Sequence, residues 1–187
     1  GYRIPTGKEQ LNSLPWNGID TINIIFSEHV DITAEDVHLH GVNAEKYSTS
    51  FSYDEGTHAA TLTLDVAIDA DKLLLVIEDE IVDVAGNDLD GEWEDGVSTT
   101  SGDGTAGGDF QFHFNVLPGD VTSSGNVVAA DVSVLASAFG SFAGGTDQRY
   151  SPFVDFDGSG NIVAADVSIL ASHFGQFLPQ DEPPIQL

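Results

Sequence analysis

A stretch of 21 residues occurs twice in this chain, and the second copy begins 35 residues after the first. Residues 120–140 and 155–175 are identical at 15 of their 21 aligned positions, which marks an internal duplication. In each copy, side chains that contain oxygen occupy positions 1, 3, 5 and 12 of a twelve-residue loop, and glycine occupies position 6. This is the spacing of a calcium loop, because about six to eight oxygen ligands surround Ca²⁺ and the glycine allows a sharp turn.

Each loop offers four candidate side-chain ligands and the backbone carbonyl at position 7. The candidates in the first loop are Asp120, Thr122, Ser124, the Asn126 carbonyl and Asp131. The candidates in the second loop are Asp155, Asp157, Ser159, the Asn161 carbonyl and Asp166. We predict two Ca²⁺ sites, with tighter binding in the second loop, because it offers three carboxylates and the first loop only two. The alternative, mainly for the first loop, is a turn closed by Asp and Ser without a metal.

The chain is strongly acidic, with 31 Asp and Glu against five Lys and Arg and a formal net charge of −26. Binding to nucleic acid needs clustered basic residues, so a nucleic-acid partner is not expected, and neither is an anionic membrane surface. The longest apolar runs, such as 73–77, are too short for membrane insertion. Cysteine and methionine are absent, so thiol chemistry is not expected, and we expect the chain to be a piece of a larger protein.

Residues 19–117 have the pattern of several short strands separated by turns, and residues 1–18 are expected to be an irregular lead-in. Alternating or β-branched segments predict strands at 21–26, 48–53, 60–64, 72–77 and 109–116. The second and third of these are expected to form a hairpin. No amphipathic helix is predicted in this region, so we expect it to form an antiparallel β-sandwich.

The pattern changes at residues 117–119, where we place a domain boundary before a duplicated domain at 118–178 and a tail at 179–187. Gly140 and Gly175 stand where C-terminal helix caps are expected. Each copy is therefore predicted to be a loop followed by one helix, and the loops are expected to be joined by a short pairing at position 8. The apolar stripes of the two helices are expected to pack against each other; their residues are Val132, Leu135, Phe139, Val167, Leu170 and Phe174.

Three motifs in the first part of the chain resemble the bacterial Ig-like domains of S-layer and other surface proteins. They are a strand at 22–30 (INIIFSEHV), a hairpin at 53–62 (YDEGTHAATL) and a turn at 82–87 (VDVAGN). The resemblance covers residues 20–117. It implies a structural spacer or an adhesive module of an extracellular or cell-surface protein, and not an enzyme.

The duplicated segment resembles the type I dockerin module, in which each half is an EF-hand-like calcium loop with Asp at position 12, followed by a helix. Thr122, Ser124 and Ser159 depart from the Asn or Asp that is usual in this family. The resemblance implies a cohesin domain as partner, contacted through loop positions 10 and 11. These positions are small and uncharged, so we expect a cohesin-like domain or another copy of the chain, with a possible homopolymer; they are Ala129, Ala130, Ala164 and Ala165.

The expected fold class is therefore a multidomain β + α chain. An antiparallel Ig-like β-sandwich would precede a small α-helical, dockerin-like pair of calcium loop–helix units.

Other parts of the chain contain candidate sites with less specific patterns. The acidic segment 83–95 predicts either a third calcium site or tight turns in which Asp and Asn bond to their own backbone. His38 and His40 could share a strand face, but no third zinc ligand accompanies them. Three aromatic residues could stack on a sugar, and the alternative for each is a place in a core or interface: Trp16, Trp93 and Tyr150.

No phosphate-binding loop, nucleophile elbow or zinc-protease motif occurs in the chain, so we do not expect an enzyme. We expect a non-catalytic, extracellular, calcium-binding module that anchors or assembles a larger secreted or cell-surface protein. One alternative is a self-assembling subunit of a surface layer or filament, in which residues 1–18 add a strand to the sandwich of the next copy. The other alternative is a carbohydrate-binding accessory module.

Overall fold

The computed structural model describes residues 2–144, 146 and 148–184, and within them the buried apolar side chains form two clusters. The residues of the larger cluster extend along the sequence from Leu14 to Val116. The smaller cluster begins with Leu117 and reaches Leu170. The change of core between residues 116 and 117 coincides with the change of pattern in the sequence.

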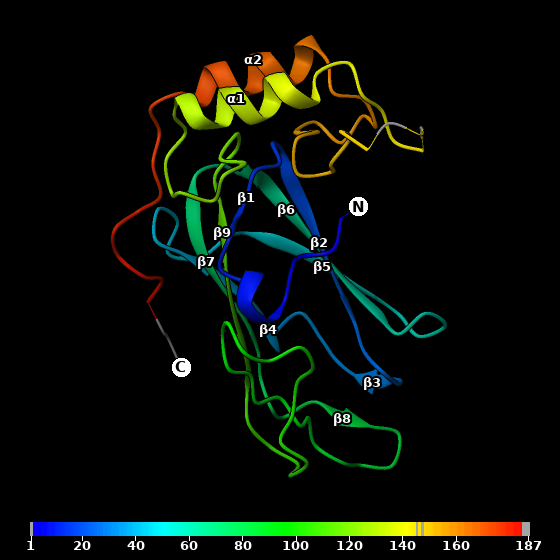
Figure 1. The fold of residues 1–187 in the computed structure, drawn as a ribbon. Helices are drawn as coiled ribbons and strands as arrows, with labels where there is room; N and C mark the ends of the chain where they lie inside the picture. Colours follow the sequence, from blue (N-terminus) through cyan, green and yellow to red (C-terminus); the bar gives the residue numbers. More distant parts are fainter. Residues whose placement is uncertain (1, 145, 147, 185–187) are drawn as a thin grey trace.

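Nine strands, two α-helices and one 3₁₀-helix make up the regular structure of the described residues (Figure 1). Their bounds are η1 Gly7–Glu9, β1 Ser13–Leu14, β2 Ile19–Ile25, β3 Val30–Asp31, β4 Val37–Gly41, β5 Thr49–Asp54, β6 Ala59–Ile68, β7 Asp71–Ile77, β8 Val82–Asp83, β9 Phe110–Val116, α1 Ala129–Ala138 and α2 Ala164–His173.

Two sheets face each other across the larger cluster. One has the strand order β1-β9-β7-β4 and the other the order β2-β6-β5, while β3 and β8 form a separate two-stranded sheet at the end of the sandwich opposite the helices (Figure 1). The alternation predicted for 109–116 is confirmed, because Phe112, Phe114 and Val116 are buried in the core. The predicted hairpin is also confirmed, as the pair β5–β6.

The beginning of the chain is part of the sandwich. Ser13–Leu14 pair in parallel with Asn115–Val116. The strand that residues 1–18 were expected to add to the sandwich of another copy is therefore paired with β9 of the same chain. The fully buried Gln10 accepts hydrogen bonds from Trp93 Nε1 (2.9 Å) and the Gly96 amide (3.1 Å). Turn-forming and polar residues dominate this segment, and for that reason its sequence predicted only an irregular lead-in.

The predicted fold class, a β-sandwich followed by a small α-helical domain of two dockerin-like calcium units, is wrong. The described chain is mostly β, its two α-helices have only ten residues each, and the pair β1–β9 is parallel. Residues of loops and turns, not only of helices, build the smaller core; examples are Leu117, Val154 and Phe156. Phe153 packs against the sandwich core, so the C-terminal part is attached to the sandwich.

Among the residues that the structure describes, no helix is long and apolar enough to cross a membrane.

A buried carboxylate at the first residue of β7 accepts several hydrogen bonds. Asp71 is 1% exposed, and its Oδ1 accepts the amides of Val42 (3.0 Å), Asn43 (3.0 Å) and Lys72 (2.9 Å). Its Oδ2 accepts the hydroxyl of Tyr47 at 2.7 Å. This arrangement fixes the turn after β4 against the adjacent strand.

We predict that Asp71→Ala lowers the free energy of unfolding by about 3 kcal/mol or more, because three amides and one hydroxyl lose their acceptor in a buried place. Urea unfolding followed by circular dichroism measures the change. Asp65→Ala is the matched control, since Asp65 is exposed on β6, where its carboxylate accepts the Ser48 hydroxyl. We expect a loss of about 0.5 kcal/mol or less in this variant. Equal losses in the two variants would contradict this role for Asp71.

Candidate functional site

The second loop brings three of its predicted ligands together. Carboxylate oxygens of Asp155, Asp157 and Asp166 all lie within 4.8 Å of one another. Asp155 and Asp166 are fully buried, while Asp157 is exposed at the open side of the loop. Oxygen atoms gathered in this way, without nitrogen or sulfur, suit a hard cation such as Ca²⁺.

Backbone amides and hydroxyls hold the buried carboxylates of the second loop. Asp155 Oδ2 accepts the Gly160 amide (2.7 Å) and the Tyr150 hydroxyl (2.8 Å), and its Oδ1 accepts the Ser159 amide (3.0 Å). Asp166 accepts the amides of Phe156 and Val163, both at 2.8 Å. These donors stabilise the ionised carboxylates, and they also fix the direction of each oxygen.

The remaining candidate ligands of the second loop contact one another. Ser159 Oγ donates to the Asn161 carbonyl at 3.1 Å, so the ligands at positions 5 and 7 face the same side. Burial raises the pKa of Asp157, but hydrogen bonding from Ser159, whose amide donates to Asp157 Oδ1 at 3.0 Å, outweighs it, and the net shift is downward. Asp157 is therefore a carboxylate at neutral pH. Burial raises the pKa of Tyr150, as does the adjacent Asp155 carboxylate, so the Tyr150 hydroxyl remains a donor to Asp155.

The first loop has the same framework with fewer charges. Asp120 and Asp131 are fully buried, and Asp120 accepts the amides of Ser124 (3.0 Å) and Gly125 (2.8 Å). Thr122 donates both its amide (2.9 Å) and its hydroxyl (2.8 Å) to one oxygen of Asp131. A hydroxyl thus occupies the place where the second loop has the Asp157 carboxylate, which gives the alternative of a metal-free turn a structural basis in this loop. Ser124 Oγ donates to the Asn126 carbonyl at 2.9 Å.

The aspartate at position 12 joins each loop to its helix. Asp131 and Asp166 each accept the amide of position 9, Val128 or Val163, at 2.8 Å. That amide precedes the first helical residue, so the carboxylate closes the loop and satisfies a donor at the helix start at once. Both helices begin directly at position 10.

The two loops do not pair with each other at position 8. Val127 of the first loop exchanges backbone hydrogen bonds with Gly175 and Gln176, which follow α2. Ile162 of the second loop does the same with Gly140 and Ser141, which follow α1. The expectation of a direct pairing between loops is therefore wrong. Each loop instead pairs with the residues that directly follow the helix of the other copy. The helices α1 and α2 lie side by side and run in opposite directions (Figure 1).

The glycines after the helices make these pairings possible. Gly140 has a φ of 81° and Gly175 a φ of 85°, a backbone conformation that strongly favours glycine. The prediction that they end the helices is confirmed, and they turn the chain directly into its pairing with the opposite loop.

An apolar groove of about 730 Å³ runs between the outer faces of α1 and α2. The predicted packing of the two apolar stripes is therefore wrong in part, because only Leu135 and Leu170 are buried. Phe139 is 47% exposed and Phe174 is 56% exposed. Related positions of the two copies line the groove: Val132, Leu135, Ala136 and Phe139, with Val167, Leu170, Ala171 and Phe174. The predicted contact residues are exposed at the helix starts: Ala129, Ala130, Ala164 and Ala165.

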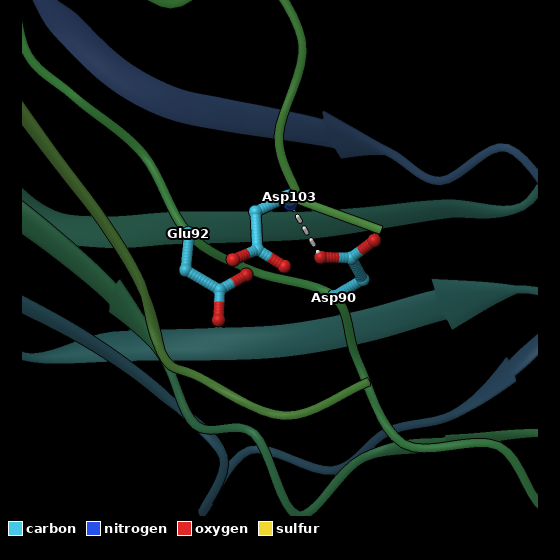
Figure 2. Close-up of side chains that lie close together, drawn as sticks. All are labelled: Asp90, Glu92 and Asp103. Carbon is cyan, nitrogen blue, oxygen red and sulfur yellow. Dashed lines mark hydrogen bonds between the residues drawn. The ribbon is translucent and has the colours of Figure 1, made fainter. Parts of the chain in front are cut away.

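A second group of carboxylates lies in the segment between β8 and β9. Asp90, Glu92 and Asp103 bring oxygens within 4.8 Å of one another (Figure 2). Asp90 accepts the amides of Asp103 (2.8 Å) and Gly104 (3.0 Å), so its carboxylate shapes the loop that follows. The nearby Asp83 accepts the amides of Ala85 and Asn87. The Asp83 contacts are those of the tight turns that the sequence offered as the alternative to a third calcium site, whereas Asp90 bonds to amides 13 and 14 residues further along the chain.

The other candidates from the sequence have internal partners. His38 Nε2 contacts Glu78 Oε1 at 3.0 Å, and the groups of three or more metal-ligating side chains found among the described residues are the two acidic groups above. Trp16 stacks between Tyr2 and Phe153. Trp93 contacts Phe110 and Phe112. The three aromatic residues proposed for a sugar therefore all take part in contacts within the chain, including Tyr150 through Asp155.

Comparisons with known proteins give little beyond this geometry. No family model matches the chain, and no curated protein matches it. Two similar solved structures are an N-terminal and a C-terminal interface mutant of a type II cohesin–X-dockerin complex from Acetivibrio cellulolyticus, with 16% and 17% identity and TM-scores of 0.30 and 0.31. Each match covers 84% of this chain and 97% of that chain. TM-scores this low do not transfer a fold or a partner.

We predict that Asp90→Ala loosens the loop at 102–105 without changing calcium binding, because its carboxylate serves the amides of this loop. Hydrogen exchange at the Asp103 and Gly104 amides should become faster by about tenfold or more if the two bonds together contribute at least 1.4 kcal/mol. Glu92→Ala is the control, since among the described residues no amide of this loop donates to the Glu92 side chain. A fall in the number of bound Ca²⁺ ions in Asp90→Ala would instead identify a third site.

Proposed function

We propose that this chain is a non-catalytic, calcium-binding assembly module of an extracellular or cell-surface protein. Ca²⁺ would occupy the two duplicated loops, and the outer face of α1 and α2 would bind a protein partner. One observation carries this proposal: in each loop, two fully buried aspartates hold the loop and the start of the adjacent helix together.

Calcium suits these loops better than other common cations. The candidate ligands are carboxylates, hydroxyls and carbonyls, and Ca²⁺ accepts such a mixed oxygen set in irregular geometry. Mg²⁺ demands nearly octahedral ligands, and Zn²⁺ prefers nitrogen and sulfur. The ion would bring positive charge next to buried aspartates that otherwise rely on neutral donors.

The small number of charges also indicates where the module works. Calcium affinity rises with the number of charged ligands, and extracellular calcium modules bind with dissociation constants of about 10⁻⁴ to 10⁻³ M. The first loop has two carboxylates among its candidate ligands and the second has three. Sites of this kind fill where calcium is abundant, as it is outside cells.

The partner that fits the groove is a separate protein with an apolar surface. Phe139 and Phe174 lie in related positions on a face without exposed charge of its own. A second copy of the chain is a poorer occupant, because two molecules of net charge −26 repel each other. A cohesin-like domain, which the sequence resemblance implies, is the first partner to test. Self-assembly into a layer or filament is the competing outcome.

We predict that the chain binds two Ca²⁺ ions and that the second loop binds more tightly. Loss of an outer-shell partner typically lowers metal affinity by about 10- to 100-fold. Asp155→Ala removes a ligand and should weaken the tighter site by more than this, while Asp120→Ala should weaken only the other site. Calorimetric titration with CaCl₂ measures both, with Asp65→Ala as the control on an exposed carboxylate. The absence of calcium binding tighter than millimolar in the unmodified chain would end the proposal.

We predict that replacing both Phe139 and Phe174 by Ser abolishes partner binding and leaves stability nearly unchanged, since both side chains are about half exposed. Binding to immobilised cohesin domains and sedimentation equilibrium in calcium report the two possible occupants. Val66→Ser is the matched control, because Val66 is a 74% exposed apolar residue on β6. A complex or a dimer that forms equally well with the double variant would exclude the groove as the interface.

A further inference from the structure

The two loops differ in two side-chain contacts that come from outside the duplicated residues. Asp155 Oδ2 accepts hydrogen bonds from the hydroxyls of Tyr150 (2.8 Å) and Tyr2 (3.2 Å), in addition to the Gly160 amide. The corresponding oxygen of Asp120 accepts the Gly125 amide at 2.8 Å, and the residue that corresponds to Tyr150 is Asn115, which bonds to the Leu11 carbonyl instead. The tyrosine contacts thus belong to the second loop.

These hydroxyls determine which oxygen of Asp155 is available. Three donors meet Oδ2, whereas Oδ1 accepts the Ser159 amide. An oxygen that already accepts three hydrogen bonds has little capacity left for a cation. The carboxylate is therefore held so that Oδ1, with a single amide donor, is the oxygen with more capacity for a cation. One carboxylate oxygen of Asp155 lies within 4.8 Å of oxygens of Asp157 and Asp166.

Tyr2 also connects the second loop to the start of the chain. The Tyr2 ring stacks on Trp16 with 4.9 Å between centroids, and Trp16 stacks on Phe153 at 5.3 Å. Trp16 Nε1 donates to the Pro152 carbonyl at 2.8 Å, and the Asn17 amide donates to the Phe156 carbonyl at 2.8 Å. Residues 152, 153 and 156 surround Asp155 in the sequence, so residues 2–17 dock directly on the second loop.

We infer that Tyr2 and Tyr150 are positioning residues of the second loop, and that calcium binding there and docking of residues 2–17 strengthen each other. The inference rests on the proposed calcium function. Coupling is reciprocal: if the docked segment orients Asp155 for the ion, the bound ion must stabilise the docked segment by the same free energy. The second loop then makes the contact between the sandwich and the C-terminal part depend on calcium.

The test compares the unmodified full chain with Tyr2→Phe, Tyr150→Phe and the double variant, which keep the rings and remove the hydroxyls. In the double variant, calorimetric titration with CaCl₂ should show affinity for the second loop about tenfold lower, the effect typical of an outer-shell partner, and unchanged affinity for the first loop. Tyr53→Phe is the matched control, because its hydroxyl serves the Val30 amide far from both loops in the sandwich. Unfolding curves without calcium check that the variants fold.

A second measurement separates positioning from a general loss of stability. In the unmodified chain, saturating Ca²⁺ should slow amide hydrogen exchange across residues 2–17, and the Asn17 amide in particular. In the double variant, this protection should disappear even when calcium saturates the loop. Two results would overturn the inference and leave the proposed calcium function intact. One is an unchanged calcium affinity in the double variant, and the other is amide exchange at residues 2–17 that does not change when calcium is added to the unmodified chain. If the unmodified chain binds no calcium, the proposed function and the inference both fail.

Discussion

The arrangement of the C-terminal part depends on buried aspartates that meet the backbone. Asp131 and Asp166 are fully buried at position 12 of the two loops, and an ionised carboxylate in such a place needs donors or a cation. Each bonds to the amide of position 9 and to an amide near the beginning of its loop. One side chain therefore sets the closure of the loop and the first residue of the helix together.

This requirement also sets the rotation of the helices. Because Asp131 must point into its loop, the residues one helical turn and two turns further on, Leu135 and Ala138, face the core with it. Val132 and Phe139 are then directed outward, and the equivalent residues of α2 behave in the same way. The apolar groove is thus a consequence of the aspartate at position 12: apolar residues beyond those that the core can take are left on the outer face. An apolar face of this kind on an acidic chain favours a binding role.

Local patterns in the sequence predicted local structure well. The duplication located both loops and both helices, and the alternation of Phe112, Phe114 and Val116 located β9. Contacts between distant residues could not be predicted in this way. The pairing of Val127 with Gly175 and of Ile162 with Gly140 joins each copy to the end of the other, and a pattern within one copy contains no sign of it. The prediction that the whole apolar stripe of each helix is buried was wrong, because the sequence does not show that the helix turns Asp131 toward the core.

The beginning of the chain shows a related limit. Gln10 is a polar residue among turn formers, and its burial depends on donors from Trp93 and Gly96 that are more than 80 residues away. Tyr2 and Trp16 likewise obtain their roles from residues 150–156, which nothing near them in the sequence indicates. Of the candidate site, the approach of Asp155, Asp157 and Asp166 was therefore predictable, whereas the residues that orient their side chains were not.

The contact between the two parts of the chain works against electrostatic repulsion. Residues 1–117 contain 23 acidic and four basic residues, a charge of −19, and residues 118–187 contain eight acidic residues and one basic residue, a charge of −7. Stacking of Trp16 between Tyr2 and Phe153, a few backbone hydrogen bonds and the ion pair between Lys72 and Glu182 hold the parts together against this repulsion. A divalent cation at Asp155 would lie beside that contact and reduce the negative charge where the parts meet. The first loop lacks the tyrosine contacts, and beside it the Gly119 amide donates to the Pro15 carbonyl at 3.0 Å. Two nearly identical sequences therefore differ in what packs against them.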